Sequence, residues 1–169
     1  MTRTAGPDKP FPAPRRARKR AVRGTDFPGA ESLLALGAGR RNPPALRRGS
    51  LSVTRAGWPL QGDAVAGGAV FDRFVVLDPA LWTIDPAEIL GCLGGRASPT
   101  ARLGLVCVAP GTAGSLVEAY AGLRGRGLRP LGPDQLLTFG LATGWQLLGY
   151  RLAFPGYASA LMTRLPQVD

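Results

Sequence analysis

The sequence has no histidine among its 169 residues and only two cysteines, Cys92 and Cys107. Without histidine, the chain acting alone has no Ser-His-Asp triad, no histidine general base and no histidine-ligated zinc. The two cysteines are too few for a disulfide framework or a cysteine metal site, and both lie among apolar residues. We therefore expect two buried free thiols, no bound metal and chemistry that depends on other side chains.

Long apolar runs are also missing. Residues 136–148 come nearest, but glycines interrupt them and they are shorter than the roughly 18 residues of a membrane span. The beginning of the chain lacks the apolar core of a secretory signal, and its early prolines disfavour an amphipathic transit helix. These observations predict a cytoplasmic protein that does not bind a membrane, with a nuclear location as the alternative if the source is eukaryotic.

Acidic residues are scarce in the first third of the chain. Residues 1–57 carry 13 basic and 3 acidic side chains, whereas residues 58–169 carry 8 of each, so the net charge of +10 comes from the first third. Six of these cations fall within nine positions: Arg15, Arg16, Arg18, Lys19, Arg20 and Arg23. Because this segment is also rich in proline, residues 1–28 are predicted to form a flexible tail, followed by one domain over residues 29–169.

The basic tail has two interpretations. Clustered arginines displace counterions from phosphates whatever the base sequence, so the tail is a candidate arm for binding nucleic acid or an acidic protein. No aromatic residue interrupts the basic run to stack on bases, which leaves a solubilising extension or a nuclear-import-like signal as the other interpretation. The oligomeric state stays open.

Residues 71–110 contain the clearest fold signal, a strand, a helix and a second strand. The apolar runs at residues 74–77 and 103–109 are continuous, as in parallel strands covered by helices on both faces. Asp85 supplies an N-cap and Pro86 the first helical position, and Gly94-Gly95 ends the helix. Asp78 follows the first strand, at the sheet edge where open parallel sheets bind ligands. The pattern predicts a βαβ unit.

The remaining elements flank this unit. An apolar strand over residues 31–36 ends in the turn Gly37-Ala38-Gly39, and a second strand follows near residues 50–57. After residue 110, two helices are predicted near residues 112–123 and 133–143. Two final strands joined by Pro155-Gly156 predict an antiparallel hairpin.

This order of elements, with an FDxxVV strand and a DPxxIL helix, resembles the class I methyltransferases that use S-adenosylmethionine. The resemblance covers residues 31–165 and implies an α/β fold with a three-layer Rossmann-like sheet, mostly parallel and ending in an antiparallel C-terminal hairpin. The first half departs from the family. The segment before Phe71 is shorter than two strands and two helices require, so the sequence resembles a degenerate relative with a reduced first half.

The resemblance also implies sites for the cofactor. It assigns Gly37 and Gly39 to the first cofactor-binding turn, and Asp63 of the Gly62-Asp63-Ala64 turn to the adenine side, although Asp63 is equally an ordinary turn residue. The family's acid two positions before the first glycine is Ala35 here. Its ribose-binding acid corresponds to Thr54-Arg55. These losses leave the cationic cofactor without two of its expected carboxylates.

Asp78 and Trp82 are the candidate catalytic residues. Amino-directed members of the family carry a D/N-P-P-Y/F/W motif at this strand end, where the acid holds an amino group and the aromatic ring stacks on a base. Here the sequence reads Asp-Pro-Ala-Leu-Trp, with one proline fewer and the aromatic residue one position later. The alternative is that Asp78 caps the turn and Trp82 fills the space between helix and sheet.

Three functional hypotheses follow. The first is methyl transfer from S-adenosylmethionine to a small molecule or nucleic acid, a reaction in which positioning a good nucleophile supplies much of the rate. The second is a non-catalytic scaffold that binds nucleic acid or an acidic partner through the basic first third. The third is an enzyme whose site a partner chain completes. Independently of these hypotheses, a glycine turn followed by arginines at positions 40 and 41 is suited to hold an anion such as phosphate.

Overall fold

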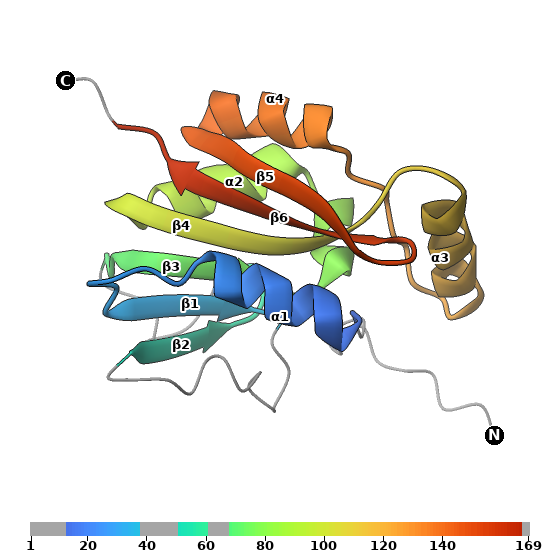
Figure 1. Cartoon of the computed structure of the whole chain (residues 1–169), viewed down its shortest axis with the longest axis horizontal. Coiled ribbons are helices and arrows are strands. Elements are labelled where there is room, and N and C mark those ends of the chain that lie inside the picture. The colour runs from blue at the N-terminus through green and yellow to red at the C-terminus, as the bar shows by residue number, and fades with distance from the viewer. Residues whose placement is uncertain (1–12, 38–50, 61–67, 167–169) are drawn as a thin grey trace.

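The computed structural model describes residues 13–37, 51–60 and 68–166, and their central feature is a six-stranded sheet in the order β2-β1-β3-β4-β6-β5 (Figure 1). Strands β2, β1, β3 and β4 run parallel, and β6 and β5 add an antiparallel pair. The strands are β1 Ser32–Leu36, β2 Ser52–Ala56, β3 Phe71–Val76, β4 Ala97–Val108, β5 Trp145–Phe154 and β6 Tyr157–Arg164. The predicted mostly parallel sheet with a C-terminal hairpin is confirmed.

Helices cover both faces of this sheet. They are α1 Arg15–Gly24, the 3-10 helix η2 Pro79–Thr83, α2 Pro86–Gly94, α3 Thr112–Leu123 and α4 Pro133–Thr143. One core cluster joins the sheet to η2, α2 and α4, and a second joins its other face to α1 and the buried side of α3. The three-layer prediction is therefore confirmed. In the described residues, no helix is long and apolar enough to cross a membrane.

Strand β3 shows how the two core clusters arise. Phe74 and Val76 point into the cluster of α2 and α4, whereas Val75 and Leu77 point into the cluster of α1. Because successive side chains of a strand alternate between faces, a strand covered on both sides is apolar at every position. This is the physical origin of the continuous apolar run in the sequence.

Helix α2 begins and ends where its sequence predicts. The Asp85 carboxylate accepts a hydrogen bond from the Ala87 N–H at 2.9 Å, Pro86 occupies the first turn, and Gly95 is the C-cap. The cap satisfies one of the backbone N–H groups that a helix start leaves without a partner. The turn at Pro155-Gly156 also joins β5 to β6 as predicted, with Gly156 at a φ of +79°.

The prediction of a flexible tail over residues 1–28 is wrong for Arg15–Gly24, which form helix α1 against the sheet. Ala17 and Ala21 recur at helical spacing and are fully or almost fully buried. Opposite them on β4, a Cβ on Gly104 would overlap the Ala21 carbonyl, so this glycine lets the helix approach closely. The folded part of the chain therefore begins before residue 29, because small apolar residues among the arginines supply a buried stripe.

Candidate functional site

The carboxyl ends of β1 and β3 lie side by side and bring Gly37 against Asp78. The Leu77 N–H donates to the Leu36 carbonyl at 2.9 Å, which continues the parallel register one residue beyond β3. Gly37 has a φ of +66°, and a Cβ placed on it would overlap the Cβ of Asp78. Two of the predicted site residues therefore meet at the edge where open α/β sheets bind ligands.

Asp78 has a structural role at this edge. Its Oδ1 accepts a hydrogen bond from the Ala80 N–H at 3.0 Å, so the carboxylate is the N-cap of η2. The residue is only 8% exposed. A mostly buried carboxylate that already caps a helix can still present its charge to a ligand at the strand ends, and the cap holds it in position there.

Trp82 lies in the core, against the last residues of β4. Its side chain is 1% exposed, and its indole N–H donates to the Val106 carbonyl at 2.9 Å. A ring held this way fills the space between η2 and the sheet and has no open face for a ligand. The structure thus supports the packing interpretation of Trp82 and removes it from the candidate catalytic residues.

The other predicted cofactor residues, Gly39 and Asp63, lie outside the residues that the structure describes, as do the arginines at positions 40 and 41. Their proposed contacts stay predictions. Within the described part of the first half, the parallel pairing of β1 and β2 places Arg55 beside Ala35 and Ala56 beside Leu36. The strand end that carries the ribose-binding acid in the family therefore carries no carboxylate over residues 51–60.

The described residues fit S-adenosylmethionine in part. The left-handed turn at Gly37 is the kind of backbone that lets a ligand approach a strand end, and Asp78 supplies one negative charge nearby. Ala35 is fully buried and apolar and Arg55 is cationic, so neither supplies a carboxylate to balance the sulfonium charge or to accept hydrogen bonds from the ribose hydroxyls. The turn at Gly37 therefore fits a cofactor-binding site, whereas Ala35 and Arg55 stand where the family has acidic residues and do not fit one.

No metal site is present among the described residues, where no group of three or more His, Cys, Asp or Glu side chains could hold an ion. Both cysteines are free thiols, but only Cys107 is buried as predicted; the prediction is wrong for Cys92, which is exposed on α2. Cys107 is fully buried on β4, and burial raises the pKa of its thiol to about 12. Its Sγ donates to the Leu131 carbonyl at 3.5 Å. A thiol that stays protonated in the core is a packing group and not a nucleophile.

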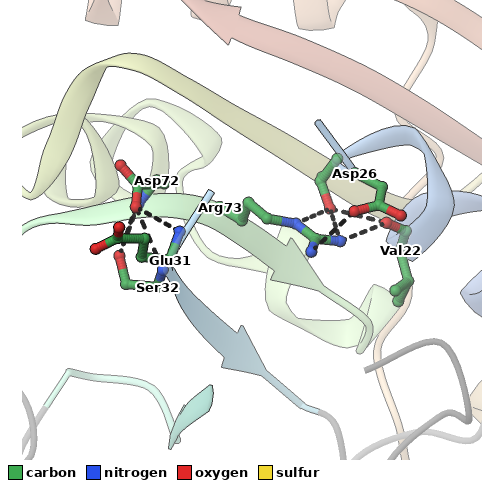
Figure 2. Close-up of polar contacts among 7 residues, drawn as sticks. Val22, Asp26, Glu31, Ser32, Asp72 and Arg73 are labelled. Atoms are coloured by element: carbon green, nitrogen blue, oxygen red, sulfur yellow. Dashed lines mark hydrogen bonds and ion pairs between the residues drawn. The ribbon is translucent and has the colours of Figure 1, made fainter. Parts of the chain in front are cut away.

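Sequence reasoning missed a polar cluster on β3 at the opposite, amino end of the sheet (Figure 2). Arg73 is 4% exposed, and its guanidinium donates to the Val22 carbonyl and to the Thr25 hydroxyl, each at 3.2 Å. It also pairs with Asp26 at 3.4 Å. These groups form the C-terminal end of α1, where a cation is favourable to the helix dipole. The signal was a charged pair inside the apolar strand FDRFVV.

The neighbouring Asp72 points the other way and joins β3 to the start of β1 (Figure 2). Its Oδ2 accepts hydrogen bonds from the Glu31 N–H at 3.1 Å, the Ser32 N–H at 3.3 Å and the Ser32 hydroxyl at 3.0 Å. Partial burial raises the pKa of Asp72, but the hydrogen bonds outweigh it and hold the pKa below its usual value. The Asp72-Arg73 pair is thus structural and lies away from the candidate site.

No protein-family model and no curated protein sequence matches the chain. Many solved structures do match its fold. The mitomycin 7-O-methyltransferase MmcR is similar with a TM-score of 0.66 and 15% identity, over 89% of this chain and 53% of that chain. The Burkholderia thailandensis 1,6-didemethyltoxoflavin-N1-methyltransferase, solved with S-adenosylhomocysteine, is similar with a TM-score of 0.66 and 15% identity, over 88% of this chain and 78% of that chain.

The similarity extends to a protein with another reaction, the [4+2]-cyclase SpnF, with a TM-score of 0.65 and 15% identity over 90% of this chain and 81% of that chain. The chain spans about half the length of MmcR. At such identities, the likeness establishes the arrangement of the elements and not the reaction. The chain therefore has a class I methyltransferase-like fold.

Proposed function

We propose that this chain is a methyltransferase-like domain that binds S-adenosylmethionine at the carboxyl ends of β1 and β3 and transfers its methyl group to a small molecule or nucleic acid. The observation that carries the proposal is the left-handed Gly37 turn placed directly against Asp78. Methyltransferases among the structural neighbours support it, since one of them was solved with S-adenosylhomocysteine bound.

In this proposal the chain binds and orients the reactants. The bound cofactor supplies a methyl group on a positively charged sulfur. The backbone at Gly37 lets the ligand approach the sheet edge, and Asp78 contributes negative charge beside it. Because a good nucleophile needs little acid–base assistance, the chain can act without histidine by positioning alone.

Calorimetry with S-adenosylmethionine and with S-adenosylhomocysteine tests this function. We expect heat of binding and a rise in Tm with ligand concentration, because a ligand that binds only the folded state stabilises it. Absence of both signals at millimolar ligand would contradict the proposal. Measuring both ligands separates binding of the common adenosyl part from any effect of the sulfonium charge.

A second candidate function is a non-catalytic scaffold. Ala35 and the end of β2 lack the carboxylates that the resemblance leads one to expect, which favours this alternative. The fold is also compatible with reactions other than methyl transfer, since SpnF is described as a cyclase. In this case the chain binds nucleic acid or an acidic partner and shows no response to either adenosyl ligand.

A further inference from the structure

Helix α1 presents a dense row of cations on its outer side. Its sequence, RRARKRAVRG, contains no acidic residue, and its apolar stripe is buried on the sheet. A surface hollow on this side is lined entirely by basic residues: Arg15, Arg16, Lys19, Arg20 and Arg23. Because the helix is anchored by its alanines and by Arg73, these cations sit on a fixed element and not on a free tail.

Arg20 connects this hollow to a second one between α1 and the β5-β6 hairpin. Its Nη1 donates to the Leu152 carbonyl on β5 at 3.2 Å, which holds the guanidinium at the edge of the sheet. The second hollow is lined by Arg20 and Arg151 together with small or apolar residues that include Leu148, Gly149 and Leu161. Among the described residues, no carboxylate lines either hollow. We call the two together the α1–β5 groove.

We propose that the α1–β5 groove binds single-stranded nucleic acid, with phosphates on the α1 cations and a base in the second hollow. Repeated cations without acids match a polyanion, and guanidinium groups suit phosphate oxygens. The apolar lining beside them suits a base, because a single strand exposes its base faces while a duplex hides them. A peptide made of acidic residues alone would match the charges but would leave the apolar lining without a partner.

The length of α1 is sufficient for a contact with a few nucleotides. From Arg16 to Arg23 the helix rises about 10 Å, two turns of an α-helix. At about 3.4 Å per stacked nucleotide, this length corresponds to about three phosphates. The proposal does not depend on the proposed methyl transfer, because the groove lies over α1 and the β5-β6 hairpin, away from Gly37.

The test uses the whole chain and a fluorescein-labelled oligothymidylate of about twelve nucleotides, within the site sizes of single-strand binders. Fluorescence anisotropy at several salt concentrations should show binding whose logarithm falls with log salt at a slope of about −2, for about three released counterions. The matched oligothymidylate–oligoadenylate duplex should bind more weakly at the same salt. Absent binding, or equal binding of the duplex, would overturn the proposal.

Charge variants locate the site. The double variant Arg16→Gln/Arg23→Gln should weaken binding about tenfold at low salt and make the salt slope shallower by about 1.4. The control Arg124→Gln/Arg129→Gln removes two exposed arginines at and after the end of α3 and should bind as the unmodified chain does. Equal losses in both variants would show that net charge alone attracts the oligonucleotide, and would overturn the site.

Leu148→Glu tests the second hollow. Leu148 is 51% exposed, so the substitution should fold, which a thermal melt checks. A carboxylate there should weaken binding of the single strand about tenfold, because it places a negative charge beside the phosphates and a polar group in the apolar hollow. Unchanged binding would overturn the base pocket. Poly-L-glutamate and unlabelled oligothymidylate are compared as competitors at equal charge. If poly-L-glutamate displaced the labelled oligonucleotide as well as oligothymidylate does, the proposal would be overturned and an acidic protein partner favoured.

Discussion

Gly37 lies against Asp78 so closely that a Cβ on the glycine would overlap the Cβ of the aspartate. This contact ties the end of β1 to the end of β3 at the candidate site. Gly37→Ala should therefore lower stability for two reasons. The left-handed backbone costs about 1–2 kcal/mol for alanine, and the overlap adds about 1–3 kcal/mol. Urea denaturation measures the sum.

Gly125→Ala is the matched control, because Gly125 has a φ of +68° and a Cβ added to it would meet none of the described atoms within 4 Å. It should show the backbone cost alone. If both variants lost the same free energy of unfolding, the close contact between Gly37 and Asp78 would not contribute to the cost of the substitution.

Asp78 and Asp85 offer a second matched pair, since each caps a helix and is followed by proline. Asparagine is as good an N-cap as aspartate, so Asp78→Asn and Asp85→Asn should both keep stability within about 0.5 kcal/mol. Only Asp78→Asn should weaken S-adenosylmethionine binding, by about tenfold, because only Asp78 lies at the strand ends. Calorimetry on both variants measures this difference, and equal affinities would contradict a ligand-binding role for Asp78.

Arg73→Met should destabilise the chain by about 2 kcal/mol, because it removes the buried guanidinium hydrogen bonds to the Val22 carbonyl and the Thr25 hydroxyl. The local effect should be faster hydrogen exchange in α1. Arg102→Met is the control, since Arg102 pairs with Arg73 in register on β4 but is only half-buried beside Phe27. A larger loss for Arg102 would contradict the anchoring role of Arg73.

Asp72 should make stability depend on pH in the acid range. Its pKa in the folded state lies below its ordinary value, so its contribution is complete above about pH 4 and is lost as pH falls through the folded-state pKa. Asp72→Asn should therefore be less stable than the unmodified chain at pH 7, by about 1 kcal/mol. The difference should shrink toward pH 2 in urea titrations, and a difference that grows on acidification would reverse the assigned sign.

The elements with local signals were predictable. Asp85-Pro86 and Gly94-Gly95 bound α2, and Pro155-Gly156 places the hairpin turn, because caps and turns depend on a few consecutive residues. The face that a helix turns toward the sheet was harder to predict from the sequence. Leu116 and Leu123 have helical spacing in α3, yet they are 69% and 89% exposed. The spacing of apolar residues shows that they share one face of the helix, whereas the burial of that face depends on which other elements pack against it.

The sequence by itself determined the βαβ unit, the hairpin and the absence of histidine chemistry, since these depend on composition and short-range pattern. The tertiary structure decided that α1 is a helix, because its anchors Gly104 and Arg73 are distant in the chain. It likewise decided that Trp82 belongs to the core and that Gly37 meets Asp78. Such contacts join residues that are far apart in the chain, so no short run of residues encodes them.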